Sequence, residues 1–523
     1  MSSSLLAQID PELRRLLPAN LYTLLWVEPS AANLMQVFEH LRSLSRLLGD
    51  YLPPSIVAQP PPVGQCRHTQ RQGTLLFTDL AGFTPLMEFY STQGPQGNQG
   101  LWAVLNRYFG LMGAIVSKSG GNLLEFTGDA LLVEFPWDEQ RQDLARAVRA
   151  GLRMQRAMTD FAEIVTPQGS LSLQMRVGIH SSEFLSIDVG TPLRMMRILL
   201  GEDVQRAKRA EGAGRVGRVC LTVQTSPLLE EQFRFEPQSP GYQLVVDDLS
   251  DATLGEYDLP RARRRSRRAL LLDRSEGAIA QEIQSLVRQL LPLASYLSPT
   301  VLRLAVANVS QRQIAPQFVV PTVVFVNLVG LSTAVERLVG DEVTALVAAC
   351  NQLFSLINAI VLEAGGILRN PTYNLDDPVM VLYFDNATHR GDDVLRAVSA
   401  AIAILDLIAQ TPPLQVQGQP YPITGRIGIA RGMVFAAEIG ERRGRRQFNL
   451  LGDAVNTAAR LMSKAGTNQI LLTQKVHDAL EALVIPEDWT FHSLGLMNLK
   501  GKTHQMVVYT VNALTPGTEL PLR

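Results

Sequence analysis

The pattern of apolar and polar positions predicts two similar series of elements along the chain. Each series begins with an amphipathic helix that leads into a Tyr-Leu-x-Pro sequence, at Tyr51 and at Tyr296. An apolar strand, a glycine-containing turn and a long helix follow in each series. The predicted segments are 34–48 and 279–291 for the first helices, 75–78 and 323–326 for the strands, and 101–117 and 341–363 for the long helices. Strands mixed with long helices predict an α+β fold with helices on a sheet.

Five short motifs recur in the same order in the two halves of the chain. The separation between matching motifs stays between 245 residues (Tyr51 to Tyr296) and 251 residues (Leu199 to Leu450). A period this long indicates duplicated domains and not a solenoid of short repeats. The matching pairs are YLPPSIV and YLSPTVL, TLLFTDLAGFT and TVVFVNLVGLS, SGGNLLEF and AGGILRNP, MRVGIHSSEF and GRIGIARGMV, and LLGEDVQRAKRA and LLGDAVNTAARL.

The repeat divides the chain into four parts. We predict a helical N-terminal lead at 1–63, a first domain at 64–260, a basic linker with a second helical lead at 261–300, and a second domain at 301–523. The charge run RARRRSRR, at 261–268, is interpreted as a solvated linker. A nucleic-acid or lipid patch is the alternative, but no aromatic residues interleave the run.

Charge and cysteine content exclude several classes of protein. The 523 residues carry 48 Lys and Arg against 49 Asp and Glu, so no global charge attracts nucleic acid. The longest apolar run, 318–331, is shorter than a membrane span and contains Pro321, which favours a buried strand followed by a turn. Cys66, Cys220 and Cys350 form neither a metal-binding spacing nor a disulfide framework, which fits a reducing cytoplasm. We expect a cytoplasmic protein without a membrane span or a nucleic-acid partner.

Two aspartates of the first copy lie in contexts that suit metal binding. Asp79 ends the apolar strand of FTDLAGFT, and Asp129 lies at the tip of a hairpin in GGNLLEFTGDALLVEF. Carboxylates at adjacent strand ends can share two divalent ions, while backbone N–H groups of the turn at Gly82 can bind phosphate oxygens. Either aspartate alone is an ordinary turn residue. Their joint occurrence predicts a metal-dependent phosphate site.

Together with RIGIARGMVFAAEIG, RRQFNLLGDAVNTAARLM and LKGK of the second copy, these motifs resemble class III adenylate/guanylate cyclases. The tandem arrangement is similar to the catalytic part of soluble adenylyl cyclases. The resemblance implies two ferredoxin-like domains with antiparallel-rich sheets, paired head to tail within the chain as a pseudo-heterodimer. It further implies that ATP is converted to 3′,5′-cyclic AMP and pyrophosphate, with Asp79 and Asp129 binding two Mg²⁺ or Mn²⁺ ions. Oligomers beyond this pairing are not predicted.

The resemblance assigns the remaining site residues across both copies. Asn456 would orient the ribose, and Arg460, four residues later on the same helix face, would neutralise charge at the transferred phosphorus. Asn449 would contact the base. The residues assigned to phosphate binding are Leu80, Ala81, Gly82, Phe83 and Thr84, together with Lys500 or Lys502, between which the sequence does not choose.

The mirror-related site has lost several of these residues. Asn327 replaces the first aspartate in the second copy, and Gln205 replaces the asparagine in the first, although Arg209 is retained. Asp377 aligns roughly with Asp129. We therefore predict a degenerate pseudo-site. Glu125 stands where related proteins commonly have a basic residue, so bicarbonate sensing is not transferred.

The predicted base site also departs from the family. The family uses a lysine on the second domain's hairpin, and no lysine lies between Gly365 and Phe384. This leaves open a guanylate or broad-specificity cyclase, or a weakly active or inactive regulatory protein that kept the cyclase fold. An active ATP cyclase remains the main hypothesis, since four catalytic positions match across the two copies.

Overall fold

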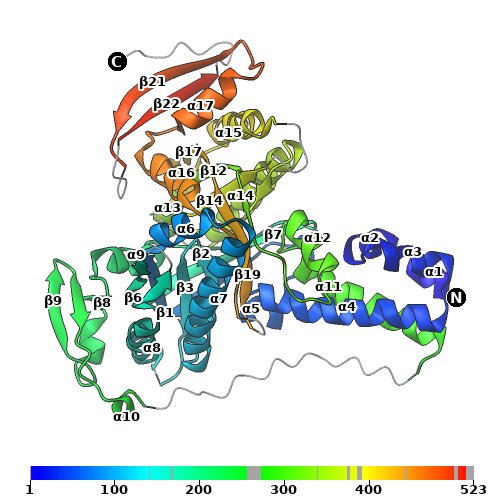
Figure 1. Cartoon of the computed structure of the whole chain (residues 1–523), viewed down its shortest axis with the longest axis horizontal. Helices are drawn as coiled ribbons and strands as arrows, with labels where there is room; N and C mark the ends of the chain where they lie inside the picture. Colours follow the sequence, from blue (N-terminus) through cyan, green and yellow to red (C-terminus); the bar gives the residue numbers. More distant parts are fainter. Residues whose placement is uncertain are drawn as a thin grey trace.

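The computed structural model describes residues 2–140, 142–166, 169–255, 273–338, 340–373, 377–385, 391–441, 444–499 and 505–513. The basic run at 261–268, Lys500 and Lys502 lie outside these ranges. Figure 1 shows two domains built around sheets, which lie against each other, and a group of helices that projects to one side. The predicted α+β class with two cyclase-like domains is confirmed.

The first domain is built on the sheet β2-β3-β1-β6-β8-β10-β9. Its central strand β1 pairs antiparallel with β3 and β6, whereas β6 and β8 are parallel. Helices α7 and α8 cover one face of the sheet, and α9 packs on the other. The elements are β1 (Arg67–Ala81), α6 (Phe83–Ser91), α7 (Gly94–Lys118), β2 (Asn122–Thr127), β3 (Ala130–Pro136), α8 (Asp143–Ala157), a 3-10 turn (Met158–Phe161), β4 (Ile164–Thr166), β5 (Gly169–Leu171), β6 (Gln174–Thr191), β7 (Arg194–Leu200), α9 (Glu202–Ala213), β8 (Val219–Thr222), a second 3-10 turn (Ser226–Leu229), β9 (Phe235–Ser239), β10 (Tyr242–Val245) and α10 (Asp251–Leu254).

The second domain repeats this topology in the sheet β13-β14-β12-β17-β20-β22-β21. Helices α14 and α15 pack on one face and α16 on the other. The elements are β11 (Gln317–Val319), β12 (Thr322–Val329), α13 (Leu331–Val335), α14 (Glu342–Glu363), β13 (Ile367–Leu368), β14 (Val379–Phe384), α15 (Asp393–Gln410), β15 (Leu414–Val416), β16 (Gln419–Tyr421), β17 (Thr424–Arg431), β18 (Val434–Gly440), β19 (Arg446–Leu451), α16 (Asp453–Lys464), β20 (Gln469–Thr473), α17 (Gln474–Glu481), β21 (Trp489–Met497) and β22 (Met506–Ala513).

Among the described residues, only α14 is long and apolar enough to cross a membrane by length and composition. Its inner face is buried in the core of the second domain, where Leu353, Phe354 and Ile357 pack against the sheet. This packing is that of a core helix. The apolar run at 318–331 forms β11, β12 and the turn at Gly330, as its pattern predicted.

The lead segments of the two copies come together in one helical module. Helices α4 and α11 lie side by side, and the shorter helices pack around them (Figure 1). Residues 302–314 also join this cluster, although the sequence-based division placed them in the second domain. The module consists of α1 (Ser2–Ala7), α2 (Asp10–Leu16), α3 (Ala19–Val27), α4 (Ala31–Tyr51), α5 (Pro54–Ala58), α11 (Glu276–Ala294) and α12 (Pro299–Ala307).

Each domain extends a two-stranded arm onto the other. The first arm consists of β7 and the half of β6 that pairs with it, and the second arm consists of β18 and β19. In the first arm, the Gly190 N–H donates to Asn351 Oδ1 of α14 at 2.7 Å. In the second arm, the Glu438 carbonyl accepts from Trp102 Nε1 of α7 at 3.1 Å. The two domains therefore pair head to tail within one chain.

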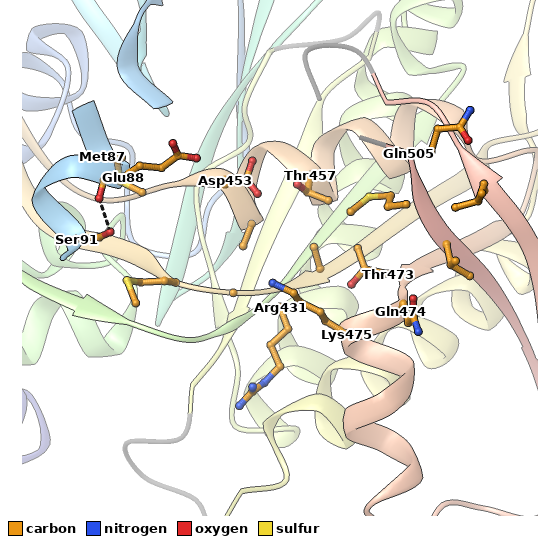
Figure 2. A pocket seen from close by; sticks show the side chains of 17 residues that line it. Met87, Glu88, Ser91, Arg431, Asp453, Thr457, Thr473, Gln474, Lys475 and Gln505 are labelled. Atoms are coloured by element: carbon orange, nitrogen blue, oxygen red, sulfur yellow. Dashed lines mark hydrogen bonds between the residues drawn. The ribbon is translucent and has the colours of Figure 1, made fainter. Parts of the chain in front are cut away.

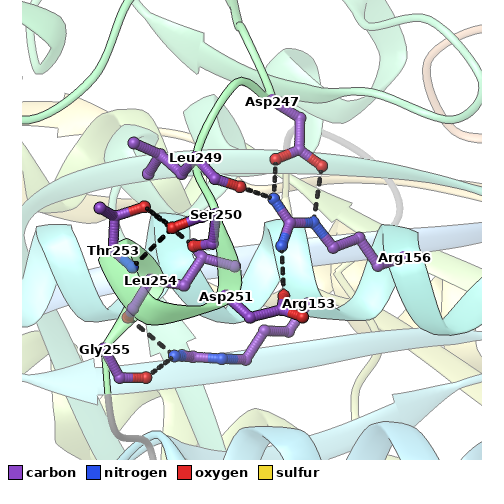
Figure 3. A network of polar contacts seen from close by, with 9 residues as sticks. All are labelled: Arg153, Arg156, Asp247, Leu249, Ser250, Asp251, Thr253, Leu254 and Gly255. Carbon is purple, nitrogen blue, oxygen red and sulfur yellow. Dashed lines mark hydrogen bonds and ion pairs between the residues drawn. The ribbon is translucent and has the colours of Figure 1, made fainter.

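A polar network fixes the end of the first domain before the linker. Arg156 of α8 makes ion pairs with Asp247 and Asp251 at 2.5 and 2.6 Å, and Arg153 donates to the carbonyls of Leu254 and Gly255 at 2.8 and 2.5 Å (Figure 3). The last segment of the first domain, from Asp247 to Gly255, is thus held against α8.

Candidate active site

The two predicted metal aspartates lie on neighbouring strands of the first domain. Asp79 lies near the end of β1, and Asp129 lies in the turn between β2 and β3, as the hairpin motif predicted. Gly128 takes a positive φ of 69° in this turn, and Gly82 takes a φ of 90° directly before α6. Such backbone conformations favour glycine, which lacks the Cβ atom that would clash.

The charges at this edge of the sheet fit a cation site. The pKa of Asp129 is raised to about 7, first because the carboxyl is removed from solvent and second because the Asp79 carboxylate lies nearby. Asp79 also forms an ion pair with Arg176 of β6 at 2.5 Å, and Arg176 pairs with Glu211 at 2.9 Å. Two adjacent carboxylates that repel each other are suitable oxygen ligands for Mg²⁺ or Mn²⁺. A bound cation would compete with Arg176 for Asp79.

Arg176 was not recognised from the sequence, although it lies within a repeated motif. Its position opposite Asp79 follows from the antiparallel register of β1 and β6. The register between strands so far apart in the chain could not be read from either motif alone.

The second domain contacts the β2–β3 hairpin, which carries Asp129, through Asn449. The fully buried Asn449 side chain on β19 donates from Nδ2 to the Gly128 carbonyl at 3.0 Å, and its Oδ1 accepts from the Leu450 N–H at 3.0 Å. The predicted base-contacting residue therefore lies next to the turn that presents Asp129.

Asn456 and Arg460 lie on α16, which begins directly after β19. The opposite face of this helix is buried, with Val455, Ala458 and Met462 in the core, whereas Asn456 and Arg460 are half-buried. Their spacing places both on one face, as predicted.

A cleft of about 590 Å³ lies beside this helix, lined mostly by the second domain and on one side by Met87, Glu88 and Ser91 of α6. Figure 2 shows Glu88 of α6 facing Asp453 of α16 across it, with Arg431 and Lys475 on another side. Asn456 and Arg460 do not line the cleft, although Asp453 and Thr457 of the same helix do. The cleft thus lies along the side of α16 that carries Asp453 and Thr457, away from the residues assigned to the site.

The strand register reveals a basic residue that the search for a lysine missed. The Arg369 N–H donates to the Val381 carbonyl at 2.9 Å, and Glu125 pairs with Leu132. Val381 and Leu132 are equivalent because they pair with corresponding phenylalanines of β12 and β1. Arg369 is therefore the second-copy counterpart of Glu125. A search of the second-copy hairpin for arginine as well as lysine would have found Arg369.

The mirror-related site is closed by groups of the second domain itself. Asp377 Oδ1 accepts from the Ser332 N–H at 2.7 Å and Oδ2 accepts from the Gly330 N–H at 3.0 Å. These amides belong to the turn equivalent to the first copy's predicted phosphate-binding turn, and here they bind a carboxylate of the same domain. Asn327 is buried, and its Oδ1 has no hydrogen-bond partner among the described residues.

The first domain's share of the mirror site is equally altered. Gln205 is buried on α9, and neither of its side-chain polar atoms has a partner among the described residues. Arg209 is exposed one turn later. The position equivalent to Asn449 holds the buried, apolar Ile198, which cannot hydrogen-bond to a base.

The fold and the site together define a class of protein. Residues 67–243 and 320–513 match the family model described as the adenylate and guanylate cyclase catalytic domain. The two matches cover most of the chain, and the chain belongs to this family.

Individual relatives are more distant. The chain is 22% identical to mouse (Mus musculus) adenylate cyclase type 10 over 414 residues, which covers 75% of this chain and 23% of that protein. An adenylate cyclase of Dictyostelium discoideum, described as terminal-differentiation specific, is 31% identical over 34% of this chain and 8% of its own length. The adenylyl cyclase CyaB from P. aeruginosa has 22% identity and a TM-score of 0.33, over 39% of this chain and all of that one. The chain spans about a quarter of the length of the mouse relative.

Proposed function

We propose that the chain converts ATP to 3′,5′-cyclic AMP and pyrophosphate at one site between its two domains. The hydrogen bond from Asn449 to Gly128 is the main support, because it joins the strand leading into α16 to the turn that presents Asp129. The names of the relatives, including adenylate cyclase type 10, agree with ATP as the substrate.

In the proposed reaction, the ribose 3′-oxygen forms a bond to the α-phosphorus, the bond to the pyrophosphate oxygen breaks, and the hydroxyl proton is released. Asn456 orients the ribose, and Arg460 neutralises charge on the phosphoryl oxygens. The N–H groups of Gly82, Phe83 and Thr84 at the start of α6 bind the triphosphate. Divalent ions held by Asp79 and Asp129 would supply charge neutralisation and polarise the attacking hydroxyl. Lys500 or Lys502 remains a candidate for the terminal phosphates.

We assign base recognition to Asn449 and Arg369. An arginine can donate to ring nitrogens of either purine, and the side-chain amide of Asn449 adds a donor. Because both groups are donors, the pair discriminates weakly, and a measurable activity with GTP is expected beside that with ATP.

The test is cyclic-nucleotide production from ATP and GTP with Mn²⁺ by the full chain. Asp79→Ala and Arg460→Ala are expected to lose activity by at least about a hundredfold, since each removes a charge at the reacting phosphate. The matched control Asn327→Ala alters the equivalent strand position of the second copy and should retain most activity. Absence of product from both triphosphates would exclude a cyclase, and full activity in Asp79→Ala would exclude this metal site.

We further propose that the mirror-related site is a degenerate pseudo-site and that the protein works in the cytoplasm. Asp377 in the anion position and Ile198 in the base position support the first proposal. All three cysteines are free thiols, which fits a reducing compartment.

A further inference from the structure

The duplicated Tyr-Leu-x-Pro sequence has no part in the proposed reaction, yet each copy holds its tyrosine in the same way. Tyr51 ends α4, and its carbonyl accepts from Arg445 Nη1 at 2.6 Å. Tyr296 follows α11, and its carbonyl accepts from Arg194 Nη1, also at 2.6 Å. The lead helix of each copy therefore contacts the arm of the other copy, since Arg445 lies next to the second arm's β19 and Arg194 begins the first arm's β7.

The tyrosine hydroxyls make a second matching contact. The Tyr296 hydroxyl donates to Asp188 of the first arm at 2.8 Å, and the Tyr51 hydroxyl lies near Glu438 of the second arm. Both carboxylates are buried. Each tyrosine is thus held at its carbonyl, and its hydroxyl lies close to a buried carboxylate of the other copy's arm.

The same two arginines also contact the segments that carry the proposed site residues, namely β2 before Asp129 and the residues on either side of Arg369. Arg445 donates to the Leu124 carbonyl at 2.9 Å and to the Leu123 carbonyl at 3.3 Å, both on β2. Arg194 donates to Asn370 Oδ1 at 2.8 Å and to the Leu368 carbonyl at 3.3 Å. We call these groups clasps. The first clasp is Arg194 with Tyr296, Leu368 and Asn370, and the second clasp is Arg445 with Tyr51, Leu123 and Leu124.

The clasps hold the chain directly beside the candidate site. Leu368 and Asn370 flank Arg369, which we assign to base recognition. Strand β2 runs on into the turn that presents Asp129, and β19, which follows Arg445, carries Asn449 and leads into α16. The first clasp therefore borders the segment that carries Arg369, and the second borders both the Asp129 hairpin and the strand that carries Asn449.

A buried guanidinium is costly unless its donors are satisfied. In the first clasp, Nη1 and Nη2 of Arg194 donate to carbonyl and amide oxygens, whereas its buried Nε has no partner among the described residues. Burial lowers the pKa of Arg194 to about 10. The planar fork of an arginine can reach acceptors on three segments at once, whereas a lysine presents a single nitrogen. The side chain is suited to joining these segments.

The helices that end at the clasps are rigidly paired. Helix α4 buries a broad apolar stripe, and its residues share one hydrophobic cluster with those of α11. The buried positions are Leu34, Val37, Phe38, Leu41, Leu44, Leu47, Leu48, Gly49, Asp50 and Tyr51. A shift of α4 against α11 would change the positions of the Tyr51 and Tyr296 carbonyls relative to each other.

We propose that Arg194 and Arg445 are positioning residues through which the paired helices α4 and α11 set the geometry of the cyclase site. This inference rests on the proposed function, because its readout is the rate of cyclic AMP formation.

Lysine substitutions test the clasps with charge retained. Arg445→Lys is expected to lower kcat about tenfold, because it loosens the hairpin that carries Asp129 and the strand leading into α16. Arg194→Lys is expected mainly to raise KM for ATP and to reduce the preference between ATP and GTP, because it frees the segment around Arg369. The matched control is Arg218→Lys, which alters an arginine that joins Glu236 and the Val245 carbonyl at the far edge of the first domain's sheet and should leave kcat and KM unchanged. Equal changes in kcat and KM in all three variants would show that the clasp arginines contribute only to general stability and do not position the site.

A double-mutant cycle tests whether the helices act through the clasp. Leu41→Ala loosens the helix pair far from the site and should lower kcat in the wild type, but should add little in the Arg445→Lys background. Ile283→Val, a milder change in the same core, serves if Leu41→Ala loses helix content by circular dichroism. Additive effects, or unchanged kcat with a loosened helix pair, would overturn the inference. An inactive wild type would instead contradict the proposed function.

Discussion

At the scale of single residues, burial at the domain interface affects the protonation of Glu125. Glu125 is buried on β2, and the pKa of its carboxyl is raised to about 8, chiefly by burial, although Arg369 and Arg445 oppose the shift. Its Oε1 has no hydrogen-bond partner among the described residues. Tyr373 also faces this carboxyl. The protein therefore favours the protonated, neutral form of Glu125.

This raised pKa predicts a stability that falls as the pH rises. Between the ordinary glutamate pKa and about 8, the folded protein binds more protons than the unfolded chain, so unfolding becomes easier with each step up in pH. Below this window Glu125 is protonated in both states and its burial does not lower the free energy of unfolding through ionisation. Above it, Glu125 is ionised in both states, and the loss of stability no longer changes with pH. Glu125→Gln removes the titration and should be more stable than the wild type at pH 8.5 by on the order of a few kcal/mol, with a smaller difference at pH 5. Urea unfolding at both pH values measures this, and parallel pH profiles would contradict it.

Arg369 carries the second residue-scale prediction. Arg369→Met should raise KM for ATP roughly tenfold and leave kcat within a few-fold, because it removes a base contact and no group at the reacting phosphorus. Steady-state kinetics with ATP and GTP measure the effect, and Arg234→Met, which removes an exposed arginine beside β9 of the first domain, is the control. An unchanged KM would remove Arg369 from the base site.

At the scale of elements, the two strand-turn-helix units differ at the turn to which we assign phosphate binding in the first copy. In the first copy the turn at Gly82 opens onto α6, and in the second copy the turn at Gly330 is closed by Asp377. A carboxylate at the start of a helix is favourable, because the free N–H groups there carry partial positive charge. The closed turn is therefore a stable arrangement in its own right.

Asp377→Ala should destabilise the second domain without impairing catalysis. It removes two charge-assisted hydrogen bonds, which corresponds to about 2 kcal/mol or more. The thermal unfolding midpoint should fall while kcat for ATP stays near the wild-type value. Asn327→Ala lacks such bonds and should lower the midpoint less. A loss of kcat in folded Asp377→Ala would show that the mirror site takes part in catalysis.

At the scale of the whole molecule, the proposed site takes residues from both domains. Arms from each domain contact the helices of the other, as the bonds at Asn351 and Trp102 show. Because both halves of the site belong to one chain, catalysis should not require a second copy.

Mixing two inactive variants tests this arrangement. Asp79→Ala and Arg460→Ala damage opposite halves of the site, so a mixture should stay inactive if the domains pair within each chain. Co-expression of the two variants, with cyclic AMP as the readout, gives the same expectation without a requirement for subunit exchange. Recovery of a substantial fraction of wild-type activity would show that domains pair between chains.

Local signals in the sequence were sufficient for the duplication, the class of fold and the places of Asp79 and Asp129. These features depend on residues close together in the chain, where periodicity and turn chemistry act. The helix carrying Asn456 and Arg460 was recognised in the same way. What these four residues do in the protein remains a prediction.

Only the tertiary structure decided which distant groups meet. Arg176 reaches Asp79, Arg369 takes the hairpin position, Asn449 contacts Gly128, and Arg194 and Arg445 join helices, arms and hairpins. Each contact depends on strand register or on packing between domains. A single residue's shift in register turns a strand's side chains to the other face, and no local pattern in the chain records the register between distant strands. The sequence by itself therefore determined the parts of the site, and the packing of the two copies determined how they are joined.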